Sequence, residues 1–190
     1  MESKSTRKRW TYAEFARLPT SGTTRYEVIG DELVVTPSPS TRHQWTVAKL
    51  LSRLLVFVEA NELGMVLPAP LDVLFAEGDY VEPDILFVRS DRLHLVSDRG
   101  VEGPPDLVVE VLSPSTAGRD RGTKLDRYRL FDVAEYWIVD PDERIVEVWD
   151  LDGGAKEPAV YGPADRLRWT PVSDDEGPTL EIEVADLFGR

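Results

Sequence analysis

Two carboxylates in consecutive apolar segments are the residues of this sequence that most suggest chemistry. Asp84 stands at the head of the apolar run Ile85–Val88, directly after a proline. Glu110 lies inside the most apolar segment of the chain, where alternation places Val108, Glu110 and Leu112 on one face of a strand. A charge beside a buried sheet is costly unless something compensates it. Two carboxylates on neighbouring strands could share a hard cation such as Mg²⁺, which prefers oxygen ligands.

Both carboxylates also have interpretations that involve no chemistry. Asp84 could accept backbone hydrogen bonds at a bend of the chain. Glu110 could form a buried ion pair with an arginine or a lysine. The residues alone leave these alternatives open beside the metal site.

A lysine and a second glutamate complete the set of candidates. Lys124 lies in a basic stretch, residues 119–129, that follows the Glu110 segment, and Tyr128 shares its helix face. A lysine over a metal site can position a water and offset charge on a phosphate. Glu27 lies in an extended segment near the N-terminus. The plain alternatives are a solvated basic helix for Lys124 and an exposed strand residue for Glu27.

Hydrophobic periodicity and turn residues predict the elements that must position these side chains. Between residues 41 and 140 the predicted order is helix, three strands, helix, strand, which favours a mixed sheet with helices on its faces. We expect the first of these helices to pack on a single sheet formed by the four strands of that region. The predicted helices are 11–18, 41–63, 119–132 and a last turn at 184–188; the predicted strands are 25–29, 32–36, 71–76, 81–88, 106–112, 135–140 and 144–151, with irregular strands ending near residue 182.

Length and composition limit the classes of protein that fit. The chain has 190 residues and reads as one domain, 1–190, with a net charge of −13. Residues 1–130 carry a net charge of −2, so this part could still present a locally basic face to nucleic acid. The absence of cysteine excludes disulfides, cysteine-held zinc and thiol nucleophiles. Since no apolar run has the length of a signal peptide or a membrane span, we expect a cytoplasmic protein with no membrane partner.

Six motifs together resemble the Uma-type restriction endonucleases of the PD-(D/E)XK nuclease superfamily, over roughly residues 11–150. Two of the motifs, Glu110–Thr116 and Glu135–Pro141, are specific in combination. The superfamily core has the order αβββαβ, the same order that the periodicity predicts for residues 41–140. The six motifs are Tyr26–Leu33, Pro37–Pro39 with His43, Glu82–Asp84, Glu110–Thr116, Lys124–Leu125 with Tyr128, and Glu135–Pro141.

The resemblance assigns roles to the four candidates. It implies that Asp84 and Glu110 hold Mg²⁺, or Mn²⁺ in its place, and that Glu27 is an additional acidic residue of the site. The sequence departs from the superfamily pattern at Leu112, where a lysine is expected, and Lys124 on the following helix can supply the same ammonium. We therefore expect Lys124 to point toward the Asp84–Glu110 pair, and its loss to reduce cleavage about a hundredfold while leaving folding nearly intact.

The resemblance thus implies an α/β (α+β) restriction-endonuclease-like fold, extended by an N-terminal hairpin and C-terminal strands, and a metal-dependent endonuclease acting on DNA. The alternative from another class is a catalytically weak or inactive nucleic-acid-binding or assembly protein on the same fold, which the acidic C-terminal third favours. A glycosidase with paired carboxylates is a third interpretation, but it gives Lys124 no role. A homodimer is expected by analogy with nucleases that cut both strands.

Overall fold

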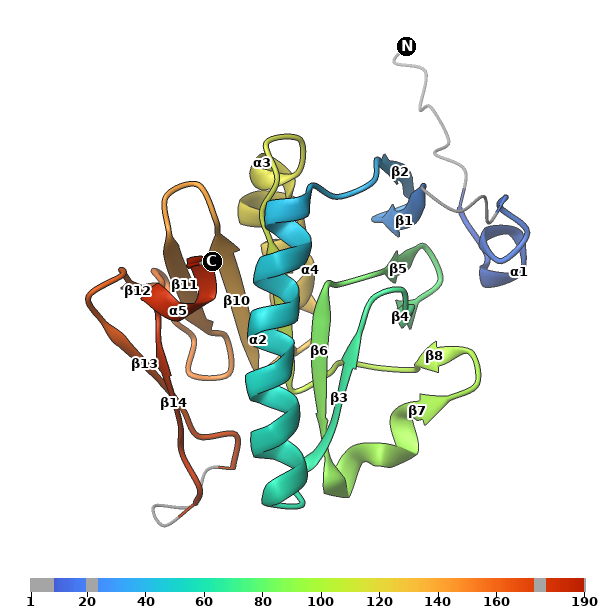
Figure 1. The fold of residues 1–190 in the computed structure, drawn as a ribbon. Helices are drawn as coiled ribbons and strands as arrows, with labels where there is room; N and C mark the ends of the chain where they lie inside the picture. The colour runs from blue at the N-terminus through green and yellow to red at the C-terminus, as the bar shows by residue number, and fades with distance from the viewer. Residues whose placement is uncertain (1–8, 20–23, 173–176, 190) are drawn as a thin grey trace.

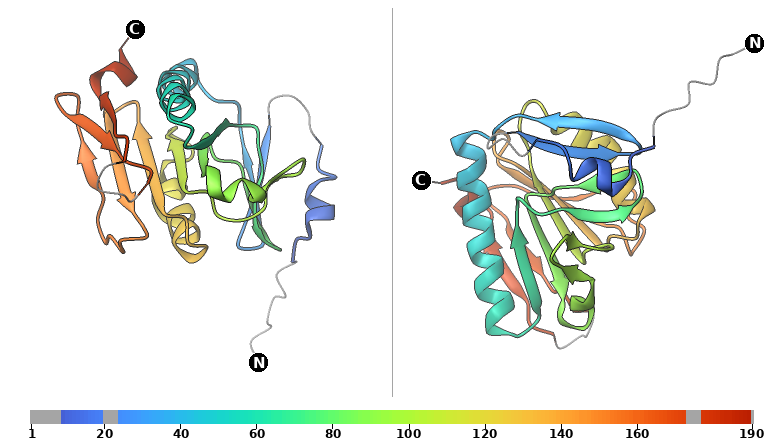
Figure 2. Two further views of the ribbon diagram at one scale, coloured as in Figure 1. Left: turned by 90° about the horizontal axis from the view of Figure 1, so that it is seen from below. Right: turned by 90° about the vertical axis from the view of Figure 1, so that its right-hand side faces the viewer.

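The computed structural model describes residues 9–19, 24–172 and 177–189, and it contains two six-stranded sheets (Figure 1). One helix, α2 (Thr41–Ala60), runs along the face of the central sheet (Figure 2). The N-cap of α2 is Ser40, whose side chain accepts a hydrogen bond from the backbone N–H of His43. Since α2 begins where the N-terminal hairpin ends, its first turn lies close to the second sheet.

The central sheet is mixed. Its strand order is β12-β11-β10-β9-β6-β3, with β9 and β10 parallel and each of the other neighbouring pairs antiparallel. A helical segment connects the parallel pair, as parallel strands require. The strands are β3 (Gly64–Pro68), β6 (Ile85–Arg89), β9 (Leu107–Val111), β10 (Glu135–Asp140), β11 (Ile145–Asp150) and β12 (Ala159–Tyr161).

The second sheet has the order β2-β1-β5-β4-β8-β7 and includes the N-terminal hairpin. Gly30 and Asp31 form the hairpin turn with φ angles of +59° and +65°, the left-handed conformation that a tight two-residue turn requires. The short helix α1 (Tyr12–Phe15) packs its Phe15 ring against Tyr80 of this sheet. The strands are β1 (Arg25–Ile29), β2 (Glu32–Thr36), β4 (Val73–Ala76), β5 (Asp79–Val81), β7 (Val96–Ser97) and β8 (Gly100–Val101).

Apolar side chains cover both faces of the central sheet. On one face, Leu50 and Leu54 of α2 join a buried cluster. The cluster also contains Trp169 of β13 (Arg166–Trp169) and Ile182 of β14 (Leu180–Glu183), the two C-terminal strands. On the other face, Leu125 and Tyr128 pack with side chains of both sheets. The short helix α5 (Ala185–Phe188) follows β14 and rests on α2. The expected mixed sheet with helices on both faces is therefore confirmed.

Between β9 and β10 the chain is helical from Ala117 to Leu130, but its winding changes along that stretch. It starts as α3 (Ala117–Arg119), continues as a π-helical turn over Asp120–Lys124, and ends as α4 (Leu125–Leu130). We call the middle part the π-turn. Both ends of the π-turn, Asp120 and Lys124, are buried. Turns of this type are rare and often occur at functional sites.

The structure corrects several predicted elements. The segment predicted as strand 71–76 forms β4 in the second sheet, and β3, which was not predicted, takes its place in the central sheet. The predicted strand 81–88 is divided between β5 and β6, which belong to different sheets. Helix α2 ends at Ala60 rather than at residue 63. A 3₁₀-helix, Ser90–Leu95, lies between the predicted strands 81–88 and 106–112, where no element was predicted.

A shared physical reason explains the first two corrections. β3 and β6 pair antiparallel through all five residues of each strand, because Gly64 allows the tight approach of Val88 at the start of the pair. The polar bend at residues 82–84 then turns the chain from one sheet to the other. Hydrophobic periodicity reports which residues are buried but not which of two adjacent sheets buries them.

Candidate functional site

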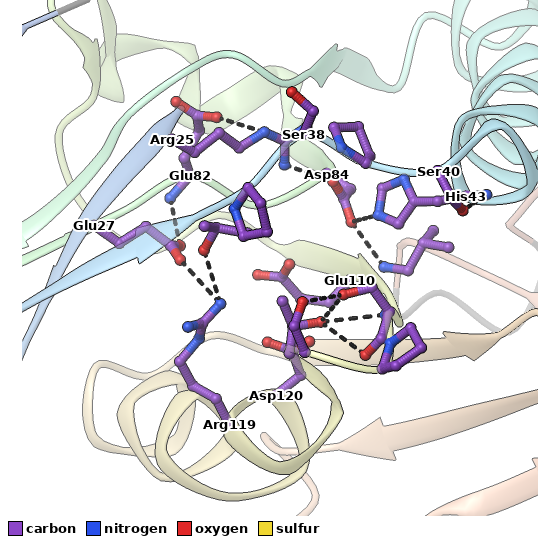
Figure 3. Close-up of a pocket in the computed structure, with 18 of the residues that line it drawn as sticks. Arg25, Glu27, Ser38, Ser40, His43, Glu82, Asp84, Glu110, Arg119 and Asp120 are labelled. Atoms are coloured by element: carbon purple, nitrogen blue, oxygen red, sulfur yellow. Dashed lines mark hydrogen bonds and ion pairs between the residues drawn. The ribbon is translucent and has the colours of Figure 1, made fainter. Parts of the chain in front are cut away.

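A cavity of about 210 Å³ lies where the two sheets, the start of α2 and the π-turn meet (Figure 3). Side chains from segments far apart in the sequence line it. Its five carboxylates are Glu27, Glu82, Asp84, Glu110 and Asp120, and its three basic side chains are Arg25, Arg119 and Lys124.

Asp84 is held by three donors at the floor of the cavity. It lies one residue before β6, and continuing the β6–β9 register by one residue places it opposite Glu110. Arg25 Nη1 donates to its Oδ1 at 2.8 Å, and the backbone N–H of Val111 donates to its Oδ2 at 2.9 Å. His43 Nε2 lies 3.1 Å from Oδ2. Burial would raise the pKa of Asp84, but His43 and Arg25 outweigh burial and hold it below its usual value, so the group is a carboxylate.

Glu110 and Lys124 form a buried pair in the same cavity. Lys124 Nζ lies 2.7 Å from Glu110 Oε1, and the hydroxyl of Tyr128 donates to the same oxygen at 2.7 Å. Burial would lower the pKa of Lys124, but the carboxylates of Glu110, Glu27 and Asp120 raise it, so the ammonium stays charged. Tyr128 and Lys124 therefore share one face of the helical segment and one acceptor.

Glu27 brings the second sheet into the site. It projects from β1, and its Oε1 lies 2.7 Å from Lys124 Nζ while accepting the backbone N–H of Glu82 at 3.0 Å. Arg25, two residues earlier on the same face of β1, reaches across to Asp84. Lys124 thus joins carboxylates from both sheets.

Two carboxyl groups of the cavity, Glu110 and Glu82, retain their protons to higher pH than usual, chiefly because they are buried. Burial raises the pKa of Glu110 to about 8; Lys124 opposes the shift, and the nearby Asp120, Asp84 and Glu27 add to it. Burial raises the pKa of Glu82 to about 7, although Arg25 Nε lies 3.0 Å from its Oε1. That contact lacks hydrogen-bond geometry, and Glu82 Oε1 has no hydrogen-bond partner among the described residues. A cation entering this cavity would replace protons.

Two loops rich in serine, threonine and proline form the mouth of the cavity. Residues 36–40 lead from β2 into α2, and residues 113–116 lead from β9 into α3. Arg119 Nη2 donates to the hydroxyl of Thr36 at 3.0 Å and so connects the two sides. Hydroxyl groups and arginine are groups that commonly contact phosphate oxygens.

The four side chains predicted as site residues, Asp84, Glu110, Lys124 and Glu27, all line this cavity. The structure also contains the contacts expected from the interpretations that involve no chemistry. Glu110 forms a buried ion pair with Lys124, and Asp84 accepts a backbone N–H. His43, which belongs to one of the motifs of the resemblance, lies with its ring beside Asp84.

Sequence reasoning missed three lining residues. Arg25 shares a strand face with Glu27, and Glu82 immediately precedes the Pro83–Asp84 motif, so adjacency to the predicted residues was the available signal. Asp120 stands four residues before Lys124, a helical spacing that indicates a shared face.

A second cavity, of about 360 Å³, lies at the opposite ends of β9 and β10 beside β13. Its partly buried Glu135 accepts hydrogen bonds from the indole N–H groups of Trp137 and Trp169, at 2.6 and 3.0 Å. Asp106 there is paired with Arg92 at 2.6 Å. Because two carboxylate oxygens of the first cavity, Glu82 Oε1 and Asp120 Oδ1, have no hydrogen-bond partner among the described residues, the first cavity is the better candidate for chemistry.

Comparisons with known proteins agree with the resemblance seen in the sequence. The family model Uma2, described as "Putative restriction endonuclease", matches residues 12–184. The uncharacterized protein sll1609 of Synechocystis sp. is 27% identical over 138 residues, which cover 72% of this chain and 77% of the relative. A crystal structure described as a putative nuclease belonging to DUF820, from Anabaena variabilis, has a TM-score of 0.75 at 20% identity and covers 94% of this chain and 97% of its own. The two proteins share a fold.

Proposed function

Because the chain belongs to the Uma2 family, we propose that it is a metal-dependent endonuclease that hydrolyses phosphodiester bonds of DNA. Asp84 and Glu110 would hold Mg²⁺ or Mn²⁺, and Lys124 and Glu27 would complete the catalytic residues. The observation that carries the proposal is the convergence of these four side chains from two sheets and a helical segment in one cavity.

The donor set fits a hydrated magnesium ion. Among the residues that the structure describes, no group of three or more histidine or acidic side chains could hold a metal ion by itself. Magnesium does not require such a group, because it keeps several waters and is commonly bound through one or two carboxylates. The cavity also contains a buried carboxylate oxygen, Asp120 Oδ1, that has no hydrogen-bond partner among the described residues. When bound, a divalent cation stabilises charge on the phosphoryl oxygens and lowers the pKa of a water.

The protein's own groups would position the reactants. Lys124 has three N–H donors, and two of them are directed to Glu110 and Glu27, which leaves one for a phosphate oxygen or for the attacking water. Charge that develops on the phosphoryl group would be stabilised by this fixed ammonium. Arg25, His43 and the N–H of Val111 keep Asp84 in one orientation, so its carboxylate needs little rearrangement.

A nicking assay on supercoiled plasmid tests the proposal. The wild-type protein should convert plasmid to open circles with Mg²⁺ or Mn²⁺ and should be inactive with EDTA. Asp84→Asn and Glu110→Gln should abolish the metal-dependent reaction, whereas Asp142→Asn, a change in an exposed carboxylate paired with Arg42, should not. Cleavage that is equal in all three variants would contradict the assignment of the site.

The alternative function, nucleic-acid binding or assembly without useful catalysis, has its own support. The ammonium of Lys124, the group proposed to act on the phosphate, is already paired with Glu27 and Glu110, which favours weak or absent catalysis. Binding of labelled DNA without cleavage by any metal tested would favour this function over the endonuclease.

A further inference from the structure

Asp120 is an unusual carboxylate within this fold. Its residue is 2% exposed, and its Oδ1 atom is buried without a hydrogen-bond partner among the described residues. Burial raises the pKa of Asp120; Lys124 and the Thr116 hydroxyl oppose that effect. A buried acceptor without a donor costs roughly 1–3 kcal/mol. Such a cost needs an explanation other than the stability of the fold.

The other buried carboxylates show that the fold can supply donors where they serve stability. Asp140, at the end of β10, is 8% exposed and has every oxygen occupied. Its Oδ1 accepts the backbone N–H groups of Asp142 and Glu143, both at 3.0 Å, and its Oδ2 accepts Arg121 Nη2 at 3.0 Å. Asp140 does not line the candidate cavity, whereas Asp120 does.

The position of Asp120 directs it at the site. It opens the π-turn that Lys124 closes, and both residues are buried and line the cavity. Figure 3 labels Asp120 at this place. Its negative charge is one of the causes that raise the pKa values of Lys124 and Glu110, so it acts on both groups at short range. The unpartnered oxygen therefore belongs to the cavity of the proposed endonuclease rather than to the surrounding core.

We infer that Asp120 is a positioning residue whose Oδ1 accepts a hydrogen bond from a water carried by the divalent cation held at Asp84 and Glu110. The inference rests on the proposed function. An outer-sphere contact agrees with the lack of a three-ligand cluster among the described side chains, and it suits an ion that retains its waters. The water bound to the cation supplies Asp120 Oδ1 with the hydrogen-bond donor that the described protein residues do not provide.

This assignment separates stability from metal binding in a testable way. Asp120→Asn is nearly isosteric and removes a buried charge without removing a hydrogen bond made by Oδ1. The metal-free variant should therefore melt at the wild-type temperature or above it. Affinity for Mn²⁺ should fall ten- to a hundredfold, as for other losses of outer-shell carboxylates.

Calorimetric titration with Mn²⁺ and thermal melts of the metal-free protein would be measured for matched variants. Asp140→Asn should show the opposite result, a lower melting temperature with wild-type Mn²⁺ affinity. Asp72→Asn removes a half-buried carboxylate that lies outside the cavity lining but near Glu27, so it controls for a general loss of negative charge and should change affinity less than threefold. Asp120→Ala, as a second variant, should lose Mn²⁺ affinity at least as strongly as Asp120→Asn.

Each other outcome has a defined meaning. Wild-type Mn²⁺ affinity in both Asp120 variants would overturn the inference and leave the proposed endonuclease intact. A melting temperature of metal-free Asp120→Asn reduced as much as that of Asp140→Asn would show a structural carboxylate and would also overturn it. Absence of Mn²⁺ binding to the wild-type protein would refute the metal site itself, and the inference with it.

Discussion

At the residue scale, Lys124 contributes to the stability of the fold and, in the proposed function, to catalysis. The sequence predicted that its loss would leave folding nearly intact, whereas its surroundings in the structure lead us to expect a loss of stability. The side chain is 3% exposed and lies 2.7 Å from both Glu27 and Glu110. Removing one member of a buried ion pair leaves uncompensated charge in the interior, which is strongly destabilising.

We therefore predict that Lys124→Ala lowers the free energy of unfolding by about 3–5 kcal/mol at neutral pH. Cleavage by the folded fraction should fall about a hundredfold or more, because a fixed donor to the transition state is lost. Urea unfolding and plasmid nicking on one preparation would measure both effects. Lys156→Ala, a change in an exposed lysine far from the cavity, should alter neither.

Glu110 makes stability depend on pH in the neutral range. Its pKa is raised from 4.5 to about 8, so the folded state holds a proton that the unfolded state releases. Stability from this group is complete below pH 4.5 and is lost as pH rises through about 8, with a slope of at most ~1.4 kcal/mol per pH unit. We predict that metal-free wild-type protein loses stability across this window and that Glu110→Gln loses less. Equal pH profiles for the two proteins would contradict the assignment.

The same proton predicts how metal binding should vary with pH. A cation at Glu110 must displace it, so Mn²⁺ affinity should rise as pH increases toward 8, with proton release detectable in calorimetry. Asp84, whose pKa is lowered by His43 and Arg25 against the effect of burial, should contribute no such dependence above pH 5. An affinity that is constant between pH 6 and 8 would show that Glu110 is not a ligand.

How far the site could be predicted depended on the kind of residue. Asp84 and Glu110 stood out because a charge in an apolar strand is conspicuous in a sequence. Arg25, Glu82 and Asp120 did not, because charged residues in polar stretches are common and only the fold shows that these three line the cavity. Contacts between segments far apart in the sequence, such as the ion pair between Lys124 of the π-turn and Glu27 of β1, leave no periodic signal.

At the scale of elements, replacing glycine with alanine should have opposite effects on stability at two positions. Gly118 lies exposed in α3, and a Cβ there would meet no atom within 4 Å. Gly118→Ala should stabilise the protein by about 0.5–1 kcal/mol through reduced freedom of the unfolded chain. Gly64 has φ +149°, and a Cβ there would lie 2.1 Å from the backbone oxygen of Val88. Gly64→Ala should destabilise by more than ~1 kcal/mol, and thermal melts of both variants would decide.

The elements themselves were partly predictable. Strand β10 was predicted with its observed limits, and the hairpin β1–β2 was placed by its Gly30–Asp31 turn. The π-turn was not predicted, because helical periodicity does not distinguish one widened turn from regular winding. Strand β3 was missed because buried and exposed side chains do not alternate regularly along it and because it closely follows a long helix.

On the scale of the whole molecule, the C-terminal strands are part of the core that supports the site. Trp169 of β13 is 3% exposed and contacts Phe87 and Trp137 edge to face, with ring centroids 5.2 and 5.9 Å away. Trp169→Ala should cost roughly 3–5 kcal/mol, as for other large aromatic residues in a core. Trp45→Ala, at a partly exposed position on α2, is the matched control and should cost much less. Chemical denaturation of both would test the comparison.

The distribution of the cavity residues along the chain has a consequence for synthesis. Glu27 enters on β1, Lys124 on the π-turn, and the strand that backs them, β10, ends only at Asp140. A chain emerging from the ribosome carries Glu27 long before it carries Lys124, with which Glu27 pairs. Translation must therefore pass β10 before the cavity can assemble, and a prematurely terminated product would contain the acids of the site without their arrangement.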